Sequence, residues 1–248
     1  MDKNTEQWNE INELLSKNGA HLNVLEEEID IEIQREYFNL AHSITEKPRK
    51  FKQLCKKYTE NINQLFDENI PEKQKKEMLT VLATLDDISI YRAIENFSKQ
   101  DTPLKSWATV ALQQSRMLIQ SNLLEDPEIF ISTGLGGRGN LLRYFCVFLN
   151  RQKENSLEEF QQKIVRNETE AALSPLKGEL EQIHFSTGYS TFTVLIPLNA
   201  DLKILFSGIV EECNLYGNFL HENMIITNVK KLTDEEIMHL LHAKNKPE

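Results

Sequence analysis

The feature that most constrains this chain is the alternation of strand-like and helix-like segments between about residues 140 and 232. The run LLRYFCVFL after Asn140 is rich in aromatic residues, which is typical of a buried strand. Apolar residues spaced by three and four then predict a helix from about Leu157. Gly188 separates two further strand-like runs, a second helix follows, and a last strand begins near His221. The sequence therefore predicts the order β-α-β-β-α-β.

Polar residues mark where these helices should begin. Ser156 with Glu159, and Thr233 with Glu236, have the spacing of capping boxes, the second at a short terminal helix. Asn199 or Asp201 is expected to cap the helix between them.

This order resembles the ferredoxin-like split βαββαβ unit, which implies an α+β domain over residues 131–248. RNA-recognition domains share the topology and stack bases on aromatic side chains of the central strands. Here one face of the third strand carries Thr191 and Thr193, and no matching RNA-binding motif is present. The resemblance implies the fold, and the strand does not provide an RNA-binding platform.

The first strand of this unit is apolar on both faces. Phe145 and Val147 point one way, and Cys146 and Phe148 point the other way. Such a strand needs cover on both sides. The unit's own helices would cover one side, and the other is left to the helical half, a homodimer mate or another protein, with packing inside the chain favoured.

Residues 1–130 are predicted to be wholly helical, with helices at about residues 5–17 and 22–44 among others. Within residues 79–114, a short helix, the turn Asp101-Thr102-Pro103 and a second helix with the small residues Ala108 and Ala111 resemble one HEAT-type repeat. The resemblance implies a HEAT-like N-terminal domain in front of the ferredoxin-like one.

A glycine segment (residues 134–139) lies between the two predicted domains. Gly134, Gly136 and Gly139 satisfy the spacing G-x-G-x-x-G, which binds a dinucleotide where the motif leads into a helix. Here it precedes a strand, so we interpret it as a mobile interdomain loop. The glycines Gly134, Gly136 and Gly137, and the exposed Arg138, are candidate partner contacts.

Residues 47–57 contain six cationic side chains and no carboxylate. The simpler interpretation is a solvated helix face that balances the acidic helix before it. The alternative is a surface that binds phosphate or an acidic protein, with Lys50, Lys52 and Lys56 as the contacts.

Composition limits the remaining choices. The net charge of -10 argues against a general nucleic-acid coat, so RNA is left open but disfavoured. The three cysteines are far apart, and no apolar run is long enough to span a membrane, which favours the cytoplasm. No motif predicts a catalytic residue, a cofactor or a metal; His239 and His242 lack a third ligand.

These observations lead to the expectation of a non-enzymatic cytoplasmic adaptor or assembly protein with protein partners, and homo-oligomerisation is left open. An RNA- or ribonucleoprotein-binding accessory protein and a small-ligand-binding regulatory protein are the alternatives.

Overall fold

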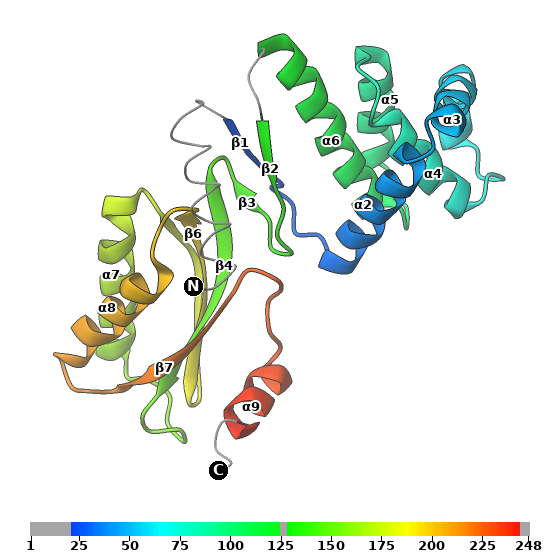
Figure 1. The fold of residues 1–248 in the computed structure, drawn as a ribbon. Helices are drawn as coiled ribbons and strands as arrows, with labels where there is room; N and C mark the ends of the chain where they lie inside the picture. Colours follow the sequence, from blue (N-terminus) through cyan, green and yellow to red (C-terminus); the bar gives the residue numbers. More distant parts are fainter. Residues whose placement is uncertain (1–20, 125–127, 244–248) are drawn as a thin grey trace. The chain divides into compact units, whose positions relative to one another are not determined.

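The computed structural model describes residues 21–124 and 128–243, and it is an α+β structure (Figure 1). The chain divides into two units, residues 1–132 and residues 133–248. The helix expected at residues 5–17 lies outside the described residues.

The first unit is built mainly from helices, which pack around one apolar core. Pro48 begins α3, where its missing N–H costs nothing, and Asp87 caps α5 by accepting hydrogen bonds from the Ser89 and Ile90 amides. The buried rings of Tyr37 and Trp107 contact edge to face, with centroids 5.3 Å apart. The helices are α2 (Ile31–Thr45), α3 (Pro48–Glu60), α4 (Glu72–Leu82), α5 (Ile88–Ser98) and α6 (Lys105–Leu124), with a short 3-10 helix, Ile62–Phe66, after α3.

The first unit also contains two short strands, so the prediction of a wholly helical N-terminal half is wrong. β1 (His21–Val24) pairs in parallel with β2 (Glu128–Ile131). The helix expected over residues 22–44 begins later because Asp30 caps it, accepting a hydrogen bond of 2.8 Å from the Glu32 amide. Residues ahead of that cap find their backbone partners in β2, more than a hundred residues away in sequence.

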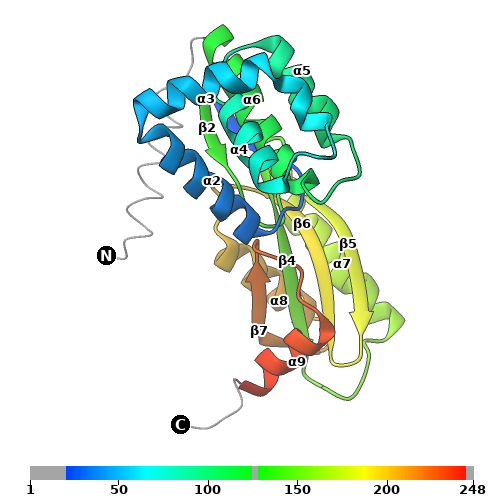
Figure 2. The same ribbon diagram turned by 90° about the vertical axis from the view of Figure 1, so that its right-hand side faces the viewer.

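The second unit is an antiparallel sheet with strand order β5-β6-β4-β7 and helices on both faces. Helices α7 and α8 cover one face and α9 lies on the other (Figures 1 and 2). The two-residue strand β3 pairs with the start of β4. The elements are β3 (Gly137–Arg138), β4 (Leu141–Asn150), α7 (Glu159–Leu173), β5 (Glu179–Ser186), β6 (Tyr189–Pro197), α8 (Leu202–Asn214), β7 (Leu220–Thr227) and α9 (Asp234–Ala243), with a short 3-10 helix, Ser174–Leu176, after α7.

Most local signals in this unit are confirmed. Gly188 turns the β5–β6 hairpin with φ of 84°, in the left-handed region that favours glycine. Asp201 caps α8 by accepting a hydrogen bond from the Ile204 amide. Thr233 and Glu236 form the expected capping box at α9.

The capping box of α7 lies two residues later than expected, at Glu158 and Gln161 instead of Ser156 and Glu159. The helix is capped by Glu158, whose backbone N–H donates to the Gln161 side chain at 2.9 Å. The Ser156 hydroxyl instead lies 3.3 Å from the Thr187 hydroxyl, in the turn between β5 and β6. That hairpin is about thirty residues away in sequence, and the local spacing could not reveal it.

The sheet has apolar cover on both faces, as β4 requires. On one face, the ring of Phe148 contacts those of Phe192 and of Phe206 in α8, with centroids 4.6 and 6.3 Å away. On the other, Phe145 and Val147 belong to a buried cluster with Ile237 of α9. The second cover therefore includes the chain's own C-terminal helix, which was absent from the expected alternatives.

Candidate nucleic-acid interface

Helix α3 and its N-cap residue contain the cationic stretch of residues 47–57. Its apolar side packs inward through Tyr58, which is buried, and through Phe51, which is half-buried. We define the basic face of α3 as the exposed cations of the helix and of its N-cap residue, which are Lys47, Arg49, Lys50, Lys52, Lys56 and Lys57. Since no carboxylate falls within residues 47–57, the charge of this face is not balanced from within the segment.

The cations of this face have few charged partners. Lys56 lies 3.9 Å from Glu60, and both side chains are mostly exposed, so this pair stabilises little. The Lys57 ammonium lies 5.1 Å from the centroid of the Tyr58 ring. Lys50 and Lys52 form no ion pair with any residue in the described ranges. Lys50, Lys52 and Lys56, which were singled out from the sequence, therefore stay exposed to solvent and accessible to an anion.

Tyr58 holds α3 in place against α4. Its hydroxyl donates a hydrogen bond of 2.8 Å to Glu77. Burial raises the pKa of Tyr58, and the Glu77 carboxylate raises it further, so the hydroxyl stays protonated and keeps donating. The basic face is thus presented by a helix with a fixed anchor.

The glycine segment is packed, and the expectation of a mobile loop is corrected. Gly134, Gly136 and Gly137 are buried. A Cβ atom at Gly134 would overlap the backbone carbonyl of Val229, which lies in the link between β7 and α9. The Leu135 amide donates a hydrogen bond of 3.0 Å to the Asn228 carbonyl in the same link. Glycine at position 134 therefore permits a close approach of two backbones, and it leaves no room there for a ligand.

The turn inside this segment is held by its own hydrogen bonds. The Gly136 amide donates to the Thr133 carbonyl, and the Thr133 hydroxyl donates back to the Gly136 carbonyl, both at 3.2 Å. Gly136 has φ of 67°, which suits glycine. These bonds make the segment a structural turn at the start of the sheet.

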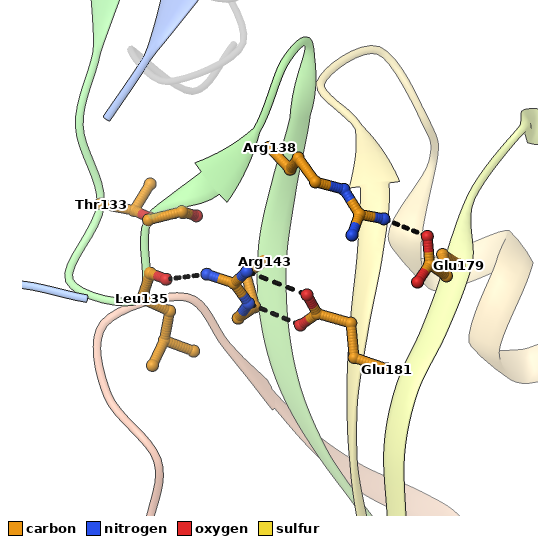
Figure 3. A network of polar contacts seen from close by, with 7 residues as sticks. Thr133, Leu135, Arg138, Arg143, Glu179 and Glu181 are labelled. Atoms are coloured by element: carbon orange, nitrogen blue, oxygen red, sulfur yellow. Dashed lines mark hydrogen bonds and ion pairs between the residues drawn. The ribbon is translucent and has the colours of Figure 1, made fainter. Parts of the chain in front are cut away.

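Arginines around this turn are paired with glutamates of β5 (Figure 3). Arg138 is half-exposed and pairs with Glu179. Arg143 is less exposed and makes a two-pronged contact with Glu181 at 2.5 and 2.9 Å, while its third donor reaches the Leu135 carbonyl at 2.8 Å. The Arg143 guanidinium holds the pKa of Glu181 below its usual value. Arg138 and Arg143 therefore already have carboxylate partners.

Sequence reasoning missed the pair of Arg143 and Glu181. The only local signal was a cation inside the otherwise apolar run LLRYFCVFL. Because a half-buried charge needs a partner, that position could have been marked as paired, but its partner is 38 residues away.

The other candidate reactive groups are not assembled into a site in the described part of the chain. No group of three or more His, Cys, Asp or Glu side chains that could hold a metal ion occurs among the described residues. Burial raises the pKa of the Cys213 thiol to about 12. Burial also raises the pKa of the Cys146 thiol, so the reactive thiolate is suppressed at both positions. Within the described ranges, no helix has the length and apolar character needed to cross a membrane.

No family model matches the sequence, and no curated protein matches it. Solved structures do match. One is a protein of Deinococcus radiodurans R1 described as a transposase, at 11% identity and a TM-score of 0.37, over 45% of this chain and 98% of the other. Another is a REP-associated tyrosine transposase bound to a REP hairpin, at 12% identity and a TM-score of 0.31, over 39% of this chain and 61% of the other.

These matches correct the expectation about function. A non-enzymatic adaptor was expected, with RNA-binding and small-ligand-binding proteins as alternatives, whereas both matched structures are transposases, which are DNA-processing enzymes. The expectation that the protein is not an enzyme is contradicted for the same reason.

Proposed function

We propose that this chain acts by binding DNA, with the basic face of α3 contacting the phosphate backbone. The observation that carries this proposal is the set of six exposed cations on α3 and its N-cap residue, only one of which, Lys56, has a carboxylate within ion-pair distance among the described residues. Lysine and arginine side chains that neutralise phosphates release condensed counterions, which drives binding.

The rest of the chain limits how DNA can approach. The net charge is -10, so surfaces away from α3 repel a polyanion on average. Binding through α3 should therefore be local, sensitive to salt and weak beside that of a basic DNA coat protein.

We further propose a fold type for each of the two units. The antiparallel order β5-β6-β4-β7, with helices after β4 and β6, supports a ferredoxin-like second unit over residues 133–248. The helices α5 and α6 are joined at Asp101–Pro103, and Ala108 and Ala111 of α6 are buried, which supports one HEAT-type pair. We also place the protein in the cytoplasm, which the three free cysteines support.

The test measures binding of the full chain to a labelled DNA hairpin and to a duplex of equal length at low salt. The hairpin is included because one of the matched proteins was bound to a hairpin. The test variant combines Lys50→Glu, Lys52→Glu and Lys56→Glu. The control combines Lys163→Glu, Lys177→Glu and Lys203→Glu, which are exposed lysines of the second unit and change the net charge equally.

The α3 variant should bind DNA at least about tenfold more weakly than the wild type, and the control should bind within about threefold of it. If DNA binding were weakened equally in the two variants, only the net charge of the protein would matter for binding. That result, or the absence of DNA binding by the wild type, would overturn the proposal.

A further inference from the structure

The strand β7 is an open edge of the sheet in the second unit. It pairs with β4 on its inner side, and no described strand pairs with its outer side. Figure 2 shows β7 as the outermost strand, at the opposite end of the sheet from β5. A shift of register near its start leaves residues 224–227 as its regular part. Proteins commonly block such an edge with lysine or proline, and the sequence of β7, LHENMIIT, contains neither.

The pairing with β4 decides which backbone groups of β7 face outward. The Asn150 amide donates a hydrogen bond of 2.9 Å to the carbonyl just before β6, so its backbone faces β6. Because successive residues of a strand direct their backbone groups to opposite sides, Val147 faces β7, where it is paired with Ile225. Ile225 therefore faces β4, and the N–H and C=O groups of Met224 and Ile226 face outward. Within the described ranges, these outward groups have no backbone hydrogen-bond partner.

A groove of about 450 Å³ lies beside this edge, between β7 and α8. Val210 and Leu215 from the α8 side and Met224 of β7 supply its apolar lining. The Leu215 side chain is 77% exposed. Ile204, which the helical repeat places on the same side of α8, is 71% exposed. Apolar side chains exposed next to an open sheet edge indicate a contact surface.

The charges around the edge favour an uncharged occupant. Arg151 lines the groove, and its Nη2 atom lies 3.6 Å from Glu222, so the cation already has a carboxylate partner. Glu211 is the remaining charged group of the groove, and it is exposed. The regular part of the edge, residues 224–227, carries no charge at all. An apolar and uncharged strand therefore suits this edge, and β7 itself is such a strand.

We propose that the outer edge of β7 pairs in antiparallel fashion with β7 of a second copy of this chain, which joins the two sheets into one. With Ile225 opposite Ile225 of the second copy, the outward groups of Met224 meet those of Ile226 in both directions. This register places apolar side chains against apolar side chains. Glu222, the nearest charge, falls outside the regular paired residues.

The same pairing covers the exposed side of α8. A two-fold axis between antiparallel edge strands is perpendicular to the shared sheet, so the α8 helices of both copies lie on the same face, one on each side of the axis. Leu215, which lines the groove at the edge, then faces the second copy and no longer contacts only water.

The test measures the oligomeric state of the full chain by sedimentation velocity over a range of concentrations. One variant is Leu215→Lys, and its control is Leu123→Lys, which adds the same charge at a side chain of α6 that is 75% exposed. A second variant, Ile226→Pro, removes an outward N–H and no donor to β4. Hydrogen exchange of the Met224 and Ile226 amides reports on the edge, with the Ile225 amide, which faces β4, as the internal reference.

The wild type should dimerise, and the Met224 and Ile226 amides should exchange more slowly as the concentration rises. Leu215→Lys should weaken the dimer at least about tenfold because it buries an unpaired charge, and Ile226→Pro should do so because it removes hydrogen bonds. Leu123→Lys should dimerise like the wild type. The α3 variant with Lys50→Glu, Lys52→Glu and Lys56→Glu should also dimerise normally, since this pairing does not depend on DNA binding.

A wild type that stays monomeric at every concentration would overturn the proposal. So would a dimer that Leu215→Lys and Ile226→Pro leave intact, because it would form through another surface. A dimer in which the Met224 and Ile226 amides gain no protection would equally overturn it, since the edges would not be paired.

Discussion

The basic face of α3 and the glycine segment both drew attention as cationic, solvent-facing stretches, yet the folded chain treats them differently. On α3 the cations point to solvent, and Lys50 and Lys52 form no ion pair among the described residues. In the glycine segment Gly134, Gly136 and Gly137 are buried, and Arg138 is paired with Glu179. The difference lies in the neighbours. β5 brings carboxylates to Arg138 and Arg143, whereas the described residues supply the basic face of α3 with one carboxylate, Glu60 of the same helix. Lys50 and Lys52, to which the described part of the fold brings no carboxylate, stay available to an anion.

The largest effect on stability is expected at Gly134, and it tests whether the glycine segment is a packed turn. Gly134→Ala should destabilise the second unit by ~3 kcal/mol, because its Cβ would overlap the backbone of Val229, which cannot rotate away. Gly208→Ala is the control, since a Cβ there meets nothing within 4 Å and α8 should gain about 0.5 kcal/mol. Denaturant unfolding followed by circular dichroism measures both. A Gly134→Ala protein as stable as the wild type would restore the mobile-loop interpretation.

A smaller effect on the free energy of unfolding is expected from replacing the two arginines beside that segment. Arg143→Ala should lower the free energy of unfolding by about 2 kcal/mol, because it leaves the half-buried Glu181 carboxylate and the Leu135 carbonyl without their donor. Arg138→Ala should change it by less than about 0.5 kcal/mol, since that pair is half-exposed. The same unfolding titration checks both, and equal effects would contradict the distinction.

The pair of Arg143 and Glu181 also predicts a dependence on pH. The pKa of Glu181 is lowered in the folded chain, so its contribution to stability is complete above 4.5, the ordinary value, and is lost as the pH falls through the lower folded value. Glu181→Gln should therefore lose part of the acid-induced decrease in stability. Unfolding curves collected at several pH values below neutrality measure this, and an identical pH profile in the variant would refute the role of the pair.

The sequence predicted those features of the fold that local spacing controls. The Gly188 hairpin, the Asp201 cap and the capping box of Thr233 and Glu236 depend on residues that are close in sequence, and all three are confirmed. The strand pair of β1 and β2 was missed because its partners are separated by about a hundred residues.

The candidate sites also divide into features set by residues close in sequence and features set by residues far apart. The amphipathic pattern of α3 is local, so its exposed lysines could be identified from the sequence. The burial of the glycine segment depends on Val229, and Arg143 finds Glu181 only once β4, β6 and β5 have paired. Neither is visible in any short stretch of the chain, because each needs the sheet to bring distant backbone together.

The smallest expected effect on stability belongs to α3 itself. Lys50→Glu, Lys52→Glu and Lys56→Glu together should leave the free energy of unfolding within about 1 kcal/mol of the wild type. Lys50 and Lys52 lie near the start of the helix, where a negative charge interacts favourably with the helix dipole. Thermal unfolding measures this, and a marked loss of stability would show that these lysines support the fold.

The salt dependence of DNA affinity tests the central claim most directly. The measurement compares the wild type, the α3 variant and the control variant with exchanges at Lys163, Lys177 and Lys203, each with the same DNA hairpin over a series of salt concentrations. Each phosphate contact adds about one to the slope of log affinity against log salt. The α3 variant should therefore have a slope shallower by about three, while the control keeps the wild-type slope. An unchanged slope in the α3 variant would contradict DNA binding through α3.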